Sequence, residues 1–178
     1  MTRYAVLLRG INVGKAKRIA MADLRELLTG LGGEDVRTHL NSGNAVLTAR
    51  RTDPERLAAR VRKALADRHG LDVGCVVRTQ ADVRAVVDGL PWPDRAEQGS
   101  KLLAHFLSAD PAPEALAKHD PRELDPDGIA LGDRVMYQWC PDGVIAAPQA
   151  AAVLEKHAGL TATGRNWNTV LKLDALMA

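Results

Sequence analysis

Residues 3–48 read RYAVLLRGINVGKAKRIAMADLRELLTGLGGEDVRTHLNSGNAVLT and contain the elements that decide the fold. The apolar run at 3–9 predicts a strand. After a polar loop, apolar side chains recur at helical spacing over 21–31 and predict a helix. Residues 36–48 then predict a β-hairpin that turns at the segment NSGN. The order is strand, helix, strand, strand.

A second helix and a fourth strand complete the unit. Asp53 and Pro54 supply an N-cap and a first-turn proline for a helix that runs to about Arg68. The segment 71–78, LDVGCVVR, predicts the last strand. This βαββαβ order is the ferredoxin-like arrangement, in which two helices cover one face of a four-stranded antiparallel sheet.

The remaining sequence repeats this order less clearly. Its elements are a strand at 101–108, a helix at 113–120, a hairpin at 128–140, a helix at 146–160, a short strand at 161–165 and a further helix at 166–177. We therefore expect an α+β fold of two ferredoxin-like halves with antiparallel sheets plus a C-terminal helix. The predicted limits are 1–90 for the first half, 91–100 for a linker and 101–178 for the second half.

The first strand predicts that both faces of its sheet are covered. Tyr4, Val6 and Leu8 alternate with Ala5 and Leu7, so apolar side chains point to both sides. The two helices cover one side. The other is expected to pack against the second half or a partner chain, and the sequence sets no oligomeric state.

Composition excludes several classes of function. The 178 residues carry a formal net charge of only +2, so no nucleic acid or membrane is required as a partner. No apolar run reaches the roughly 18 residues that span a bilayer, and the first residues are too short and polar for a signal peptide. We expect a cytoplasmic protein. Cys75, Cys140 and the five histidines are scattered, which predicts no disulfide, metal site or cofactor.

Three polar stretches rich in glycine or asparagine stand out: RGINVGKAKR at 9–18, NSGN at 41–44 and RNWNT at 165–169. In their order and spacing they resemble the family known as domain of unknown function 1697, whose members carry LLRGINVGG, SGN and RNWNT. The resemblance covers essentially the whole chain. It implies two ferredoxin-like halves and no particular activity, substrate or catalytic residue. Lys15 stands where the family usually has a glycine.

Topology places the first two stretches at one end of the sheet. The first two strands run parallel, so the loop 9–18 and the turn 41–44 leave the sheet on the same side. We expect them to touch, with side chains partly exposed, and to bind a small anionic or phosphate-bearing ligand. The candidate ligand-binding residues are Arg9, Asn12, Lys15, Ser42, Asn44, Arg165, Asn166 and Asn168.

A structural role competes with this interpretation. Asparagine and serine side chains close turns on their own backbone, and glycines supply positive φ angles. In the third stretch, Asn166 or Asn168 can cap the last helix while Trp167 anchors it.

Two other functions stay open. One is an enzyme whose site lies between the halves. It would use Arg9, Asn12, Ser42 and Asn44, with Arg165, Asn166 and Asn168 as further candidates, and the absence of a carboxylate pair, triad or metal set leaves its reaction undefined. Residues 10–15 lack the length and the Ser/Thr of a Walker loop, and Ser42 lacks the frame of a nucleophile elbow.

The second open function is a nucleic-acid or protein interaction module that uses Arg56, Arg60 and Lys63 on the second helix.

Overall fold

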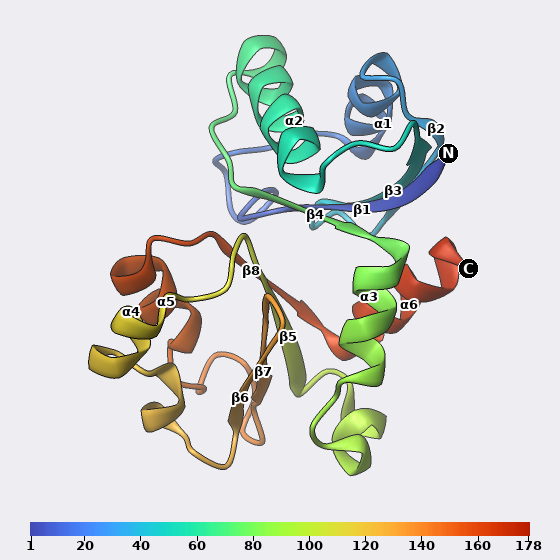
Figure 1. Ribbon diagram of the computed structural model, residues 1–178. Coiled ribbons are helices and arrows are strands. Elements are labelled where there is room, and N and C mark those ends of the chain that lie inside the picture. The colour runs from blue at the N-terminus through green and yellow to red at the C-terminus, as the bar shows by residue number, and fades with distance from the viewer. The chain divides into compact units, whose positions relative to one another are not determined.

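The computed structural model describes all 178 residues and has the predicted α+β fold with two similar halves (Figure 1). The chain divides into two compact units. The first contains Met1–Arg84 together with Leu173–Ala178, and the second contains Ala85–Lys172. Each unit has its own four-stranded antiparallel sheet. No helix combines the length and apolar character needed to cross a membrane.

The first half follows the predicted βαββαβ order, and its strands lie side by side in the order β2-β3-β1-β4. Its elements are β1 (Thr2–Leu8), α1 (Met21–Gly30), β2 (Glu34–His39), β3 (Asn44–Ala49), α2 (Pro54–His69) and β4 (Cys75–Thr79), followed by α3 (Gln80–Asp88). The predicted cap of α2 is confirmed, because Asp53 Oδ1 accepts from the backbone N–H groups of Glu55 and Arg56.

The second half repeats this topology with the strand order β6-β7-β5-β8. Its elements are η1 (Pro93–Gln98), β5 (Leu102–Leu107), α4 (Pro113–Lys118), η2 (Pro121–Leu124), β6 (Ile129–Gly132), β7 (Val135–Trp139), α5 (Ala150–Ala158), β8 (Ala162–Asn166) and α6 (Trp167–Met177). The short 3₁₀ helix η1 occupies most of the segment 91–100, for which the prolines predict a linker.

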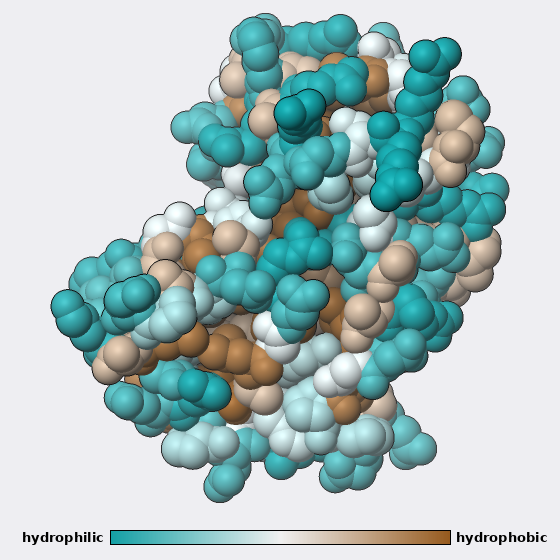
Figure 2. All heavy atoms as spheres, viewed as in Figure 1, coloured by the Kyte–Doolittle hydropathy of each residue, from teal (hydrophilic) through white to brown (hydrophobic).

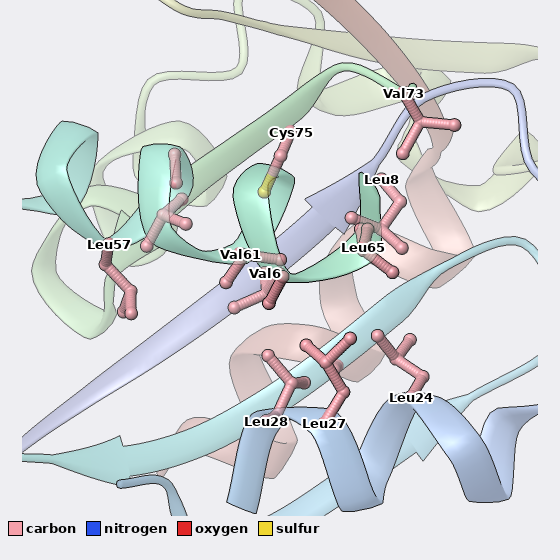
Figure 3. Close-up of a cluster of buried hydrophobic side chains, with 14 of the residues drawn as sticks. Val6, Leu8, Leu24, Leu27, Leu28, Leu57, Val61, Leu65, Val73 and Cys75 are labelled. Carbon is pink, nitrogen blue, oxygen red and sulfur yellow. The ribbon is translucent and has the colours of Figure 1, made fainter. Parts of the chain in front are cut away.

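The core of the first half lies between its sheet and the helices α1 and α2 (Figure 3). Leu24, Leu27 and Leu28 of α1 point toward the sheet, as their spacing predicted. The outer sides of both helices carry mostly hydrophilic side chains (Figure 2). All five residues from Tyr4 to Leu8 are buried, which confirms that both faces of β1 are covered.

Polar contacts of Arg3 and Arg84 hold residues 174–178 in the first compact unit, and Arg3 Nη1 donates there to the carbonyl oxygen of Ala178. Arg3 Nη1 donates to the carbonyl oxygen of Met177 at 2.6 Å. The Arg84 guanidinium pairs with the Asp174 carboxylate at 2.8 Å. The last turn of α6 therefore belongs to the compact unit that begins with β1.

The β2–β3 turn packs closely on the end of β1, and this requires glycine at position 43. Gly43 has a φ of +81°, and a Cβ atom there would lie 2.7 Å from Leu8 Cβ and 3.0 Å from Ile11 Cδ1. Its carbonyl oxygen accepts from the Leu8 N–H at 2.9 Å. A side chain at this position would meet both backbone strain and a steric clash.

Gly43→Ala is therefore expected to destabilise the protein more than a glycine replacement that brings strain alone. Gly70 supplies the control, because it has a φ of +64° and a Cβ atom added there would have no heavy atom within 4 Å. We expect about 1–3 kcal/mol of extra loss for Gly43→Ala over Gly70→Ala, from overpacking. Urea denaturation of both variants measures the difference. Equal losses would contradict the close approach.

His105 is a buried polar side chain in the core of the second half. Its Nε2 lies 3.0 Å from Gln138 Oε1, and Gln138 Nε2 donates to the carbonyl oxygen of Pro148 at 2.8 Å. Burial lowers the pKa of His105, and the hydrogen bond to Gln138 offsets this only in part. The folded protein therefore holds this imidazole neutral.

A lowered pKa in the folded state makes stability depend on pH. The unfolded chain takes up the proton first, so stability is fully present above pH 6.5, the ordinary pKa, and falls as the pH drops below it. We expect His105→Gln to reduce the slope of unfolding free energy against pH below 6.5. One titrating group contributes at most about 1.4 kcal/mol per pH unit to this slope. Denaturation across this range measures the slope, with the exposed His69→Gln as the control. An unchanged slope in His105→Gln would refute the assignment.

Candidate functional site

The loop 9–18 and the turn 41–44 touch one another, as the topology predicted. Asn12 Nδ2 donates to the carbonyl oxygen of Asn41 at 2.7 Å. The entry to β4 lies at the same end, because the Arg9 N–H donates to the carbonyl oxygen of Gly74 at 2.8 Å. We call the surface formed by residues 9–18 and 41–44 the polar edge.

Asn12 closes the loop on itself and ties it to the turn. Its backbone has a φ of +54°, and its N–H donates to the carbonyl oxygen of Lys17 at 2.9 Å. The Oδ1 atom accepts from the Ile19 N–H at 3.0 Å, and Nδ2 donates to the Ile19 carbonyl at 2.9 Å as well as to Asn41. Both polar atoms of the side chain thus bind backbone. We call this set of bonds the Asn12 clasp.

Asn44 also has a structural role, and the expectation that its side chain is partly exposed is wrong. Asn44 is fully buried, and its Nδ2 donates to the His39 carbonyl at 3.0 Å and to Ser42 Oγ at 2.9 Å. The reason is its place in the sheet. Asn44 is the first residue of β3 and pairs with both Leu7 and His39. Ser42, in the turn itself, is exposed.

Cationic side chains dominate the exposed part of the polar edge. Four of them project from the loop: Arg9, Lys15, Lys17 and Arg18. No acidic residue occurs before Asp23, in the first turn of α1. The Arg18 guanidinium folds over the loop, where Nε and Nη2 donate to the Gly14 carbonyl at 3.0 and 2.7 Å. The loop therefore holds several positive charges with no carboxylate of its own.

A hollow of about 350 Å³ opens at the polar edge. Its lining residues are Asn12, Arg18, Ile19, Ala20 and Asn41. Ala20 is also the N-cap residue of α1, and no side chain caps this helix. Backbone N–H groups of an uncapped first turn attract anions. The α2 helix differs, because Asp53 already occupies its N-terminus.

The third motif serves the architecture of the second half. Arg165 is buried, with Nη1 donating to Thr163 Oγ1 at 2.8 Å and to the Gly164 carbonyl at 2.9 Å. Asn166 Oδ1 accepts from the Thr169 N–H at 3.0 Å, so Asn166 is the predicted cap of α6. Trp167 is buried, also as expected.

Asn168 packs against the segment that leads into β5. Its Oδ1 atom lies so close to Gly99 that a Cβ atom at position 99 would clash with it. The neighbouring Trp167 N–H donates to the Gly99 carbonyl at 3.0 Å. Because residue 99 is a glycine, the segment RNWNT can pack directly against the backbone that leads into β5.

Sequence reasoning missed a second buried arginine that matches Arg165. Arg78 pairs with Ala5 in the first sheet just as Arg165 pairs with Ala104 in the second. Arg78 is also buried, and its Nη1 donates to the carbonyl oxygen of the preceding residue at 2.9 Å. A shared sequence pattern could have revealed this match. In both RTQAD at 78–82 and RNWNT at 165–169, an arginine is followed by a polar residue that caps the next helix.

The basic stripe on α2 is exposed, but two of its members are engaged. Arg60 Nη2 donates to the Leu31 carbonyl at 2.9 Å, and Lys63 pairs with Asp67. Arg56 completes the stripe. No group of three or more histidine, cysteine or acidic side chains lies close enough to hold a metal ion.

Comparison with known proteins supports the fold and the family resemblance. The conserved bacterial protein SP0830 from Streptococcus pneumoniae is 25% identical and superposes with a TM-score of 0.77, over 99% of this chain and 98% of that one. No curated protein matches significantly. Residues 1–137 match the model of a family described as "Protein of unknown function (DUF1697)". That range spans more than half of the chain and includes the whole polar edge, so this protein belongs to the DUF1697 family.

Proposed function

We propose that the first half binds a small anion, such as a phosphate-bearing metabolite, at the polar edge. One observation carries the proposal: the uncapped N-terminus of α1 opens into the hollow beside Arg18. Partial positive charge at a helix N-terminus and a guanidinium both favour an anion, and together they favour it more than either alone.

The exposed cations extend this attraction to the surrounding surface. Arg9, Lys15 and Lys17 lie on the loop that borders the hollow, and none of the acidic side chains of the chain falls within it. Such a local positive field raises the concentration of anions near the site. Lys15 adds one positive charge to this field.

In this proposal the asparagines position the site and the cations contact the ligand. The Asn12 clasp holds Ile19 and therefore the start of α1, and Asn44 holds the turn. Arg165, Asn166 and Asn168 stay outside the proposal, because their side chains support β8, α6 and Gly99 in the second half.

Removing two of the exposed cations is expected to weaken anion binding without loss of stability. The test variant is Lys15→Gln with Lys17→Gln, and Arg56→Gln with Arg62→Gln on α2 is the matched control. A thermal-shift screen with nucleotides, sugar phosphates and polyphosphate measures binding, since a ligand at 100-fold over its Kd adds about 2.7 kcal/mol. If no anion stabilises the unmodified chain, or if both double variants respond alike, the proposal fails.

Breaking the clasp is expected to impair stability and binding together. Asn12→Gly removes the side-chain bonds but tolerates the φ of +54°. We expect a loss of about 1–3 kcal/mol, because the backbone groups of Ile19 and Asn41 lose their partner. Anion binding should weaken as the start of α1 loosens. A variant as stable as the parent in urea denaturation would show that the clasp does not hold the loop.

A further inference from the structure

A second cavity, of about 570 Å³, lies at the other end of the first sheet. The lining includes Met1, at the start of β1, and Ala49, at the end of β3, whereas the polar edge follows the end of β1. In Figure 1 the N-terminus and the loop after β1 lie at opposite ends of this sheet. The volume falls within the range of about 300–1,000 Å³ that is typical of small-molecule sites.

The floor of the cavity is apolar. Leu28 of α1, Leu47 of β3 and Leu57 of α2 line it, and all three belong to the hydrophobic core of the first half. They come from three different elements packed together, so the floor has a fixed shape. Above these buried leucines, the partly buried Leu31 and Ala49 and the exposed Met1 present apolar surface to a hydrocarbon group that enters the cavity.

The rim of the cavity is cationic. Arg50 and Arg51 lie in the connection between β3 and α2, and Arg60 lies on α2. All three are exposed and none is paired with a carboxylate; Glu34 is the one acidic residue in the lining. Arg60 Nη2 donates to the Leu31 carbonyl at 2.9 Å, which uses one of its five N–H donors and holds the guanidinium at the rim.

The connection that carries two of the arginines is held in place by a buried tyrosine. The Tyr4 hydroxyl donates to the Thr52 carbonyl at 2.8 Å and accepts from the Thr52 N–H at 2.8 Å. Arg51 directly precedes this fixed residue. The helix N-terminus nearby does not serve as the anion site, because Asp53 occupies it.

We propose that this cavity binds an amphipathic organic anion. Its aliphatic chain would lie on the leucine floor, and its carboxylate or phosphate head group would meet Arg50 and Arg51. Planar guanidinium groups bind both head groups through paired hydrogen bonds. An inorganic anion would use only the rim, and a cationic amphiphile would be repelled by it. The site is separate from the polar edge and does not depend on it.

The test titrates the intact chain with decanoate, decyl phosphate and decylamine, below their micelle-forming concentrations. We expect one or both anions to bind by calorimetry and to shift the amide NMR signals of Gly32 and Gly33, which line the cavity. The two anions distinguish a carboxylate from a phosphate ligand. Decylamine should not bind. Equal binding of decylamine, or amide shifts confined to residues outside the cavity, would overturn the proposal.

Three double variants locate the head group. Arg50→Gln with Arg51→Gln should weaken binding of the anion about tenfold, the usual effect of losing a charge-assisted hydrogen bond. Arg56→Gln with Arg62→Gln should leave the affinity unchanged. Lys15→Gln with Lys17→Gln should also bind the amphipathic anion normally, which separates this site from the polar edge. Loss of binding in the lysine variant, or unchanged affinity in the Arg50 and Arg51 variant, would refute the assignment.

Discussion

The first strand has no exposed side chain from Tyr4 to Leu8, and this burial constrains everything around it. β3 and β4 must pair on either side of β1, and α1 and α2 must cover one face. The polar groups at the two ends of β1 then bond to segments that are far away in sequence. At one end the Leu8 N–H binds Gly43, and at the other the Tyr4 hydroxyl binds Thr52. Both proposed ligand sites lie at these ends.

The two halves share a topology but differ at the loop after the first strand. The Leu107 N–H binds the Arg134 carbonyl at 2.9 Å, the same distance as between Leu8 and Gly43. In the second half only the segment 108–112 separates β5 from α4, and Ser108 Oγ accepts from the Thr161 N–H at 2.9 Å. The first half instead inserts a long cationic loop held by its own clasp. The long cationic loop is therefore a feature of the first half that the second half does not share.

Much of the fold was predictable because apolar spacing and capping residues agree along the chain. The order of elements, the cap at Asp53 and the contact between the two motifs all followed from pattern and topology. The structural roles of Asn12 and Asn44 could not be predicted, because the sequence does not distinguish an asparagine that binds a ligand from one that binds backbone. The arginine-rimmed cavity was not predictable either. Sequence spacing groups Arg60 with a stripe on one helix, and only packing brings it near Arg50.

The contacts of Arg3 and Arg84 with the last turn of α6 have a consequence during synthesis of the chain. A ribosome releases β1 to β4 long before it releases residues 173–177. The nascent first half thus lacks these polar contacts, and the buried side chains of Leu173 and Met177, until the segment 173–177 has been made. N-terminal units generally fold first as they emerge. In this protein the first compact unit is completed by a segment that is made only after the whole of the second unit.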